Sequence, residues 1–177
     1  MPLPLGLRCR SWLVEVPEPG SRDPAARIAA QDQYLSSCLA AWCKDLDNAS
    51  HTLGQVASFH FMRYLDPIHF PGWDITVVLR FLGTTTTLTA IQGEVTGRLN
   101  AQKCAREIIK FDECTEADWD ATVLSEYGGP TVGPAFAEFL GAATRLTLDG
   151  KGSGLLTLHS VADNWAHCFR LITTGLG

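Results

Sequence analysis

The sequence predicts an α+β fold in which a small, mainly antiparallel sheet packs against several helices and the C-terminal part of the chain is helical. Two observations support this fold class. Runs with strand patterns lie mostly ahead of the segments with helical periodicity, with some crossover, and one strand candidate is almost wholly apolar. The chain has 177 residues, which suits one domain with its own core, so residues 1–177 are treated as a single domain.

The first predicted elements are a strand, a long helix and a pair of strands. Residues 10–16 alternate and include β-branched side chains, which is typical of a strand. After a proline-rich break, apolar positions recur at helical spacing over residues 24–47. Residues 56–65 and 73–83 predict two strands. The second is nearly all apolar before Arg80, so we expect a central strand that is covered on both faces.

A helix and another strand are predicted next. The threonine run that begins at Thr84 leads into the helix, on which Glu94 and Arg98 form an i,i+4 ion pair. Residues 104–114 then have the pattern of a strand.

The last third of the chain predicts three helices. Thr115 should cap a short helix that extends to Tyr127. A second helix follows a Gly-Gly-Pro turn and ends near residue 146. A loop at residues 149–154 then separates it from a final helix at about 154–173.

Charge and hydropathy exclude several classes of partner. The formal net charge is -5, and no cluster of basic residues is present, so we expect no nucleic-acid partner. No apolar run has the length of a transmembrane helix, so we expect no membrane partner. The N-terminus also lacks the pattern of a secretory signal, and these features together predict a cytoplasmic protein.

The cysteines predict neither a metal site nor a disulfide framework. No two of the six are separated by the two-residue gap of a metal or redox pair. The glycine-rich loop at 149–154 also lacks the pattern of a phosphate-binding loop. We therefore expect no cofactor. The six cysteines are Cys9, Cys38, Cys43, Cys104, Cys114 and Cys168.

The predicted last helix carries one candidate site. At helical spacing His159, Asp163, His167 and Arg170 fall on one side, away from the apolar stripe. This arc has two interpretations. It is either an ordinary solvated face, or the wall of a cleft in which Asp163 orients His167 and Arg170 supplies a fixed positive charge.

Two arginines in strand segments form a second candidate site. Arg63 and Arg80 lie in otherwise apolar runs, where an unpaired guanidinium would be costly. Each therefore either pairs with a carboxylate or faces a polar cavity, or extends its head to water from an edge position. Tyr64 stands at the end of its strand, where loops often carry function.

Three separated segments, at residues 58–81, 126–130 and 165–172, match motifs of a known family in the same order. They contain Arg-Tyr-Leu-Asp-Pro with a following Leu-Arg strand, then Glu-Tyr-Gly-Gly, then His-Cys-Phe-Arg-Leu. Together they resemble the C-terminal domain of lantibiotic dehydratases, which also occurs alone as the thiopeptide-type bacteriocin biosynthesis domain. The resemblance spans nearly the whole chain.

The resemblance implies an enzyme that acts on ribosomally made peptides. Such domains eliminate glutamate from glutamylated serine or threonine, and related enzymes join two dehydroalanines in a formal [4+2] cyclisation that forms a pyridine. This chain departs from the eliminating family, because Glu126 replaces an arginine and Val78 replaces the first arginine of the paired-arginine strand. Since elimination needs cations to hold the leaving carboxylate, a glutamate lyase is disfavoured.

The resemblance therefore favours a pyridine-forming cyclase that binds a modified precursor peptide. The chain is short for a cyclase with its own leader-binding domain, so either a separate leader-binding protein or partner enzyme delivers the substrate, or the chain catalyses a different, late tailoring step; a homodimer is left open. Two alternatives are another tailoring enzyme of the same pathway and a non-catalytic partner that binds peptide or a larger enzyme. The candidate residues are Tyr64, Tyr127 and His167 for proton transfer, and Arg63, Arg80, Asp163 and Arg170 for binding.

Overall fold

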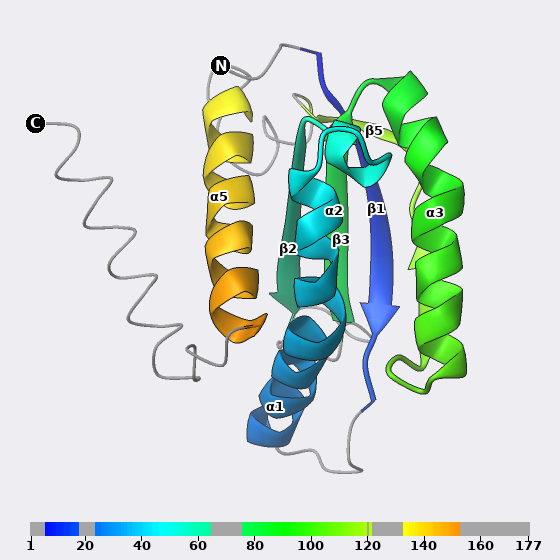
Figure 1. The fold of residues 1–177 in the computed structure, drawn as a ribbon, viewed down its shortest axis with the longest axis vertical. Helices are drawn as coiled ribbons and strands as arrows, with labels where there is room; N and C mark the ends of the chain where they lie inside the picture. Colours follow the sequence, from blue (N-terminus) through cyan, green and yellow to red (C-terminus); the bar gives the residue numbers. More distant parts are fainter. Residues whose placement is uncertain (1–5, 18–23, 65–75, 120, 122–132, 153–177) are drawn as a thin grey trace, which may run out of the picture.

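The computed structural model describes residues 6–17, 24–64, 76–119, 121 and 133–152. It confirms an α+β fold with a small antiparallel sheet, and Figure 1 shows helices packed in front of that sheet and beside it. The strand order is β2-β3-β1-β4, and β5 also pairs with β1. The strands are β1 (Arg8–Glu15), β2 (Ser58–Tyr64), β3 (Thr76–Gly83), β4 (Lys110–Glu113) and β5 (Ala117–Asp118).

The predicted helix at 24–47 is a continuous helical path with an irregular middle. It comprises α1 (Pro24–Tyr34), a π-helical turn (Leu35–Leu39), a 3-10 turn (Ala40–Trp42) and α2 (Cys43–Asp47). The hydroxyls of Ser36 and Ser37 both donate to the carbonyl of Gln33, at 3.0 and 2.7 Å. Such bonds compete with the regular helical ladder, which accounts for the change of helical type at this point.

The helix after the threonine run agrees with the prediction, but the following strand is shorter than expected. Thr84 caps α3 (Thr85–Cys104) through its hydroxyl, which accepts from the N–H of Thr87 at 3.2 Å. Arg106 then has a φ of 61°, in the left-handed region, which turns the chain away from the helix axis. The strand that was predicted from residue 104 therefore begins only at Lys110.

The predicted helix cap at Thr115 was wrong. Residues 117–118 pair with β1 instead, and the Asp118 carboxylate accepts the N–H of Ala121 at 3.0 Å. Aspartate is among the strongest N-cap residues, and its position after a short strand delays the helix start. The sequence pattern placed this start three residues too early because both residue types cap well.

The predicted loop at 149–154 was also wrong over its first four residues. The last described helix, α5 (Gly133–Gly152), continues through residues 149–152. Leu148 is fully buried in the main core, so packing of the helix overrides the weak helical propensity of the neighbouring glycines. The predicted final helix at 154–173 lies outside the described residues.

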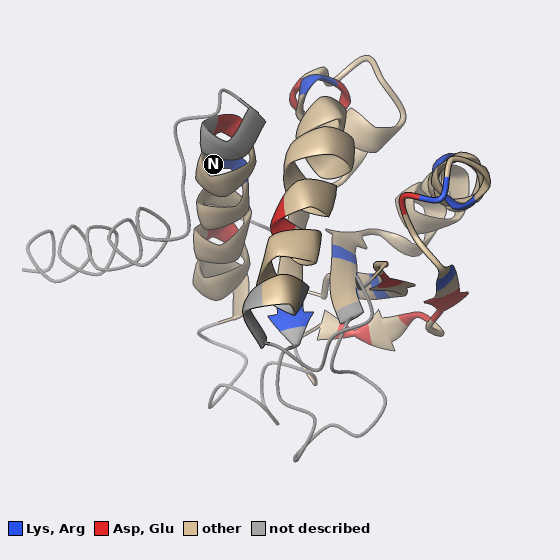
Figure 2. Ribbon diagram, turned by 90° about the horizontal axis from the view of Figure 1, so that it is seen from below, with Lys and Arg blue, Asp and Glu red and all other residues tan. Residues whose placement is uncertain are grey.

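The sheet has two different faces, because successive side chains on a strand point to opposite sides. One face, which we call the helix-covered face, carries Trp12, Phe59, Leu79 and Phe81 and forms the main core with residues of α2 and α3. Figure 2 shows these helices together on one side of the sheet. The opposite face, which we call the second face, carries Cys9 and Leu82 in a smaller cluster with Trp119 and Ala137. No helix among the described residues is long and apolar enough to cross a membrane.

Helix α5 lies along the free edge of β2. The N–H of Phe61 donates to the hydroxyl of Thr144 at 3.3 Å, and the hydroxyl of Ser58 donates to the carbonyl of Ala137 at 3.0 Å. The approach is close, since a Cβ at Gly141 would lie 2.7 Å from the Ser58 hydroxyl. The helix therefore satisfies and covers this stretch of strand edge, which protects it from pairing with another chain.

Candidate functional site

Four polar residues form a row across the second face of the sheet. His60 of β2 lies opposite Arg80 of β3, and Arg80 lies opposite Ser11 of β1. The carbonyl of Ser11 accepts the N–H of Cys114 at 2.8 Å, which extends the row past the end of β4. Directly opposed side chains on one face of an antiparallel pair are neighbours. We call His60, Arg80, Ser11 and Cys114 the polar row.

Between β1 and β3, the residue pairs that flank the polar row are apolar. On one side Cys9 is opposite Leu82, and both are buried. On the other side Leu13 is opposite Val78, which is also buried. A polar row between apolar rows costs desolvation energy unless its members find partners, so its presence here calls for a reason.

His60 occupies the buried end of the polar row. Its side chain is 0% exposed, and neither ring nitrogen has a hydrogen-bond partner among the residues that the structure describes. The ring of Trp119 packs against it, with 5.5 Å between ring centroids. Burial, reinforced by the charge of Arg80, lowers the pKa of His60 from 6.5 to about 3. The imidazole is therefore neutral at physiological pH, with one nitrogen able to donate and the other able to accept.

The depressed pKa of His60 predicts that the protein loses stability on mild acidification. The unfolded chain binds a proton on this histidine near pH 6.5, whereas the folded chain does so only near pH 3, so stability falls as the pH drops between these values. The expected loss is about 2.5 kcal/mol between about pH 7.5 and about pH 4.5, measured by urea unfolding. The variant His60→Leu should have a flatter profile over this range. An equal slope in both proteins would show that His60 does not titrate in this way.

Arg80 stands at the centre of the polar row and is partly exposed. Its Nη1 atom is nevertheless buried, and its neighbour His60 is fully enclosed. Burial raises the pKa of the Cys114 thiol, and the charge of Arg80 only partly opposes this shift. Cys114 accordingly remains a protonated thiol at neutral pH rather than a nucleophilic thiolate.

Arg63 lies on the opposite face of the sheet from Arg80. Arg63 and His60 are separated by an odd number of positions on β2, so their side chains point to opposite faces of the sheet. The guanidinium of Arg63 forms an ion pair with Asp32 of α1 at 2.7 Å. This carboxylate partner is one of the environments that the sequence predicted for it. The structure thus separates the two strand arginines, and Arg63 instead borders a cavity of about 310 Å³ between β2 and α5.

Of the other predicted site residues, the structure describes one, Tyr64. Tyr64 is the last residue of β2 and pairs with Thr76. The remaining candidates lie outside the described residues, and their roles stay predictions. They are Tyr127, Asp163, His167 and Arg170.

Sequence reasoning missed His60. Its signal was a single histidine between two phenylalanines, Phe59 and Phe61, in an apolar strand. Such a residue on its own predicts only a buried histidine. The strand register places His60 opposite Arg80 and so makes it part of the polar row. The sequence does not specify this register residue by residue.

A second polar cluster joins α2 and α3 on the other side of the molecule. The potential ligand atoms of Asp45, His51 and Glu94 lie within 4.8 Å of one another, which is compatible with a metal ion. However, Arg98 already bonds to Asp45 and Glu94, at 2.5 and 2.6 Å. The Nδ1 of His51 also accepts the N–H of Leu53 at 3.2 Å, so its Nε2 carries the proton and faces the carboxylates as a donor. The cluster is thus an arginine-centred network that joins two helices.

Removing Arg98 should destabilise the protein. Arg98 bridges two carboxylates, and its guanidinium lies 5.2 Å from the ring centroid of Trp42. The variant Arg98→Met should therefore lower the free energy of unfolding by about 1–3 kcal/mol. The hydrogen bond from Arg98 lowers the pKa of Asp45 below 3.8, so this stabilisation is present above that pH and is lost as the pH falls through the folded-state pKa.

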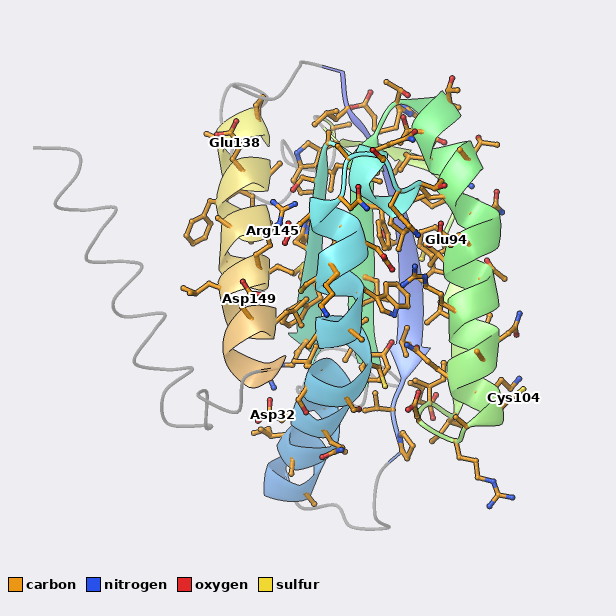
Figure 3. The ribbon with its side chains drawn as sticks, viewed as in Figure 1. Asp32, Glu94, Cys104, Glu138, Arg145 and Asp149 are labelled. Carbon is orange, nitrogen blue, oxygen red and sulfur yellow. The ribbon has the colours of Figure 1, made fainter. Side chains whose placement is uncertain are left out.

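Arg145 provides a matched control for Arg98. It pairs with Asp47 at 2.8 Å, but both side chains are about half exposed. Figure 3 shows Arg145 on α5, away from Glu94 of α3, which pairs with Arg98. We expect Arg145→Met to change the free energy of unfolding by less than about 0.5 kcal/mol. Equal losses in the two variants would contradict the special position of Arg98.

Comparisons with known proteins provide no identification. No protein-family model matches the chain, and no curated protein matches it.

Proposed function

We propose that this protein is a biosynthetic enzyme that acts on a ribosomally made, dehydroalanine-containing peptide, and specifically a thiopeptide-type cyclase that forms a pyridine by a formal [4+2] reaction. The proposal rests on the sequence motifs and on one structural observation, the polar row. The two strands that carry the motifs pair with each other, and Arg80 of one is opposite His60 of the other. Because the polar row lies on one face of the sheet, it offers a surface on which a peptide can be oriented.

The proposed reaction needs no oxidant. The hydroxyimine form of one dehydroalanine amide supplies a four-atom azadiene, and the alkene of the second dehydroalanine adds to it with formation of two C–C bonds. Loss of water from the former amide carbon follows. Elimination of the leader peptide as its carboxamide then yields the aromatic pyridine. The enzyme has to align two alkenes, polarise an amide and move protons.

Arg80 is suited to polarising the amide. A partly exposed guanidinium donates charge-assisted hydrogen bonds to an oxygen, and the apolar rows around it lower the local dielectric constant. Tyr64, Tyr127 and His167 remain the proposed groups for proton transfer, with Asp163 and Arg170 in supporting roles. The separate ion pair of Arg63 with Asp32 favours a structural role for that residue.

The composition of the polar row favours cyclisation over glutamate elimination. Among its four members Arg80 is the permanent cation, and His60 is neutral because its pKa is lowered to about 3. A site that holds a leaving glutamate needs stronger positive charge. Another tailoring step on the same kind of peptide, or non-catalytic peptide binding, would use the same row and is distinguished by experiment.

Mass spectrometry of a dehydrated, azole-containing precursor peptide tests the proposal. The peptide is incubated with the protein with its leader attached and, separately, without it. Loss of water together with release of an intact leader carboxamide is the expected result. A small mass change on the leaderless peptide would instead indicate a tailoring enzyme. Unchanged peptide that remains bound to the protein would indicate a non-catalytic partner.

A further inference from the structure

We propose that a cavity between α1 and the turn after α3 binds a free α-amino acid with an apolar side chain, held by Arg106 and Glu107. This cavity, which we call the turn cavity, has a volume of about 420 Å³. In Figure 1 α1 and the end of α3 lie toward the same end of the sheet. The inference goes beyond the proposed function, because no residue of the turn cavity belongs to the polar row. Its lining includes Ala30, Gln33, Tyr34, Ser37, Arg106 and Glu107.

The first argument is that one wall of the turn cavity is a helical surface. Its four residues from Ala30 to Ser37 recur at i, i+3, i+4 and i+7, and Ser37 lies in the π-helical turn, a feature that is frequent at functional sites. Tyr34 is buried, and its hydroxyl donates to the side-chain oxygen of Gln102 at 3.1 Å, which fixes the base of the cavity to α3. The cavity therefore has ordered walls, and its volume is in the range of small-molecule sites.

The second argument is the residue type at the end of α3. Arg106 has a φ of 61°, and its N–H donates to the carbonyl of Lys103 at 3.1 Å. The N–H of Glu107 donates to the carbonyl of Gln102 at 2.9 Å, which completes a Schellman motif. Glycine is the usual residue at the left-handed position of this motif, because a Cβ there is unfavourable. An arginine held there at a cost in stability is explained if its side chain has a function.

The Arg106 side chain is available to a ligand. It is exposed and lines the turn cavity, and it forms no ion pair with any residue that the structure describes. The Schellman motif fixes the backbone from which this side chain extends. The turn therefore presents a guanidinium at the cavity.

The third argument is the carboxylate beside this arginine. Glu107 is exposed and lines the same cavity. Burial is the largest cause of the raised pKa values of Tyr34 and Cys38, and the charge of Glu107 raises both further. Its carboxylate therefore lies near the base of the cavity, where Tyr34 is located. The turn cavity thus combines a cation and an anion from successive residues.

These groups match the two charges of an α-amino acid. The guanidinium of Arg106 can bind a carboxylate through two parallel hydrogen bonds, and the carboxylate of Glu107 can accept from an ammonium group. The amide of Gln33 adds a donor and an acceptor, while Ala30 and the ring of Tyr34 add apolar surface for the ligand's side chain. A dicarboxylate would repel Glu107 and a diamine would repel Arg106, so the cavity favours a zwitterion with an apolar side chain.

An NMR titration of the isotope-labelled full-length protein with L-leucine tests the site. Leucine should bind with a Kd below about 1 mM and shift the amide signals of Ser37, Arg106 and Glu107. N-acetyl-leucine, which lacks the ammonium group, and leucine amide, which lacks the carboxylate, should each bind at least about 3-fold more weakly. No shift at about 10 mM leucine, or equal binding of either analogue, would overturn the proposal.

The variant Arg106→Gly separates binding from stability. Because glycine suits the left-handed position, this variant should raise Tm by about 2–4 °C while it weakens leucine binding about 10-fold. Glu107→Gln should weaken binding about 3- to 5-fold. Lys103→Met is the control, since Lys103 is in the last turn of α3 but does not line the cavity, and it should bind leucine as the wild type does.

Three outcomes with these variants would contradict the site. Unchanged binding by Arg106→Gly would show that the arginine holds no ligand. A lower Tm together with weaker binding would show that Arg106 supports the fold instead. Equal weakening in Arg106→Gly and Lys103→Met would show a general effect of positive charge rather than a site in the turn cavity.

Discussion

Replacing Arg80 with methionine is expected to reduce kcat/KM for peptide modification at least about 100-fold. Arg80 is the central, partly exposed member of the polar row, and its guanidinium is the group proposed to polarise the reacting amide. Removal of one such donor from a catalytic site commonly costs two to three orders of magnitude in rate, about 3–4 kcal/mol. The rate of ring formation is measured by mass spectrometry at limiting peptide concentration, with folding of the variant checked by circular dichroism.

Two further variants make the Arg80 prediction specific. Arg80→Lys retains the charge but loses the planar fork, so it should recover only part of the activity. Arg145→Met removes an arginine from an exposed pair with Asp47 and should leave the rate unchanged. Full activity of a folded Arg80→Met protein would show that the polar row takes no part in the reaction.

Substituting Gly54 with alanine should cause the largest loss of stability, at least about 3 kcal/mol. A Cβ at this position would lie 2.0 Å from the carbonyl oxygen of Asn48 and 2.8 Å from that of Asp45. Both are backbone atoms, so no side-chain rotation can relieve the clash. The turn also holds His51, whose carbonyl accepts the N–H of Gly54 at 2.9 Å. Urea unfolding gives the change in free energy.

Gly93 supplies the matched control for this substitution. It lies in the exposed middle of α3, and an added Cβ would have no neighbour within 4 Å. Gly93→Ala should therefore raise the free energy of unfolding by about 0.5–1 kcal/mol, because alanine is the better helix former. Similar destabilisation by both substitutions would contradict the close packing at Gly54.

The fold was predictable where periodicity and packing agree. The apolar run before Arg80 predicted a central strand, and β3 does lie between β2 and β1. The helix at 24–47 was predicted as a whole, but its irregular middle depends on serine hydroxyls that compete with the backbone. The errors at residues 115–118 and 149–152 arose where a rival cap residue or tertiary packing outweighed local propensity.

The site was predictable only in part, because it depends on which side chains share a face. Arg63 and Arg80 are both arginines in apolar strands and therefore looked equivalent in the sequence. Their positions in the register separate them, one with Asp32 on the helix-covered face and the other with His60 on the second face. Strand alternation fixes the face within each strand, but the pairing between strands has to come from the structure.

Photo-crosslinking tests the central claim most directly, which is that the peptide binds on the polar row. A precursor peptide with a diazirine amino acid next to the reacting dehydroalanines is irradiated with the full-length protein, and the crosslinked residues are identified by mass spectrometry. We predict crosslinks at Ser11, Arg80 or Cys114, which share the second face of the sheet. Crosslinks confined to the cavity beside Arg63, at Thr144 or Thr147, would contradict this assignment.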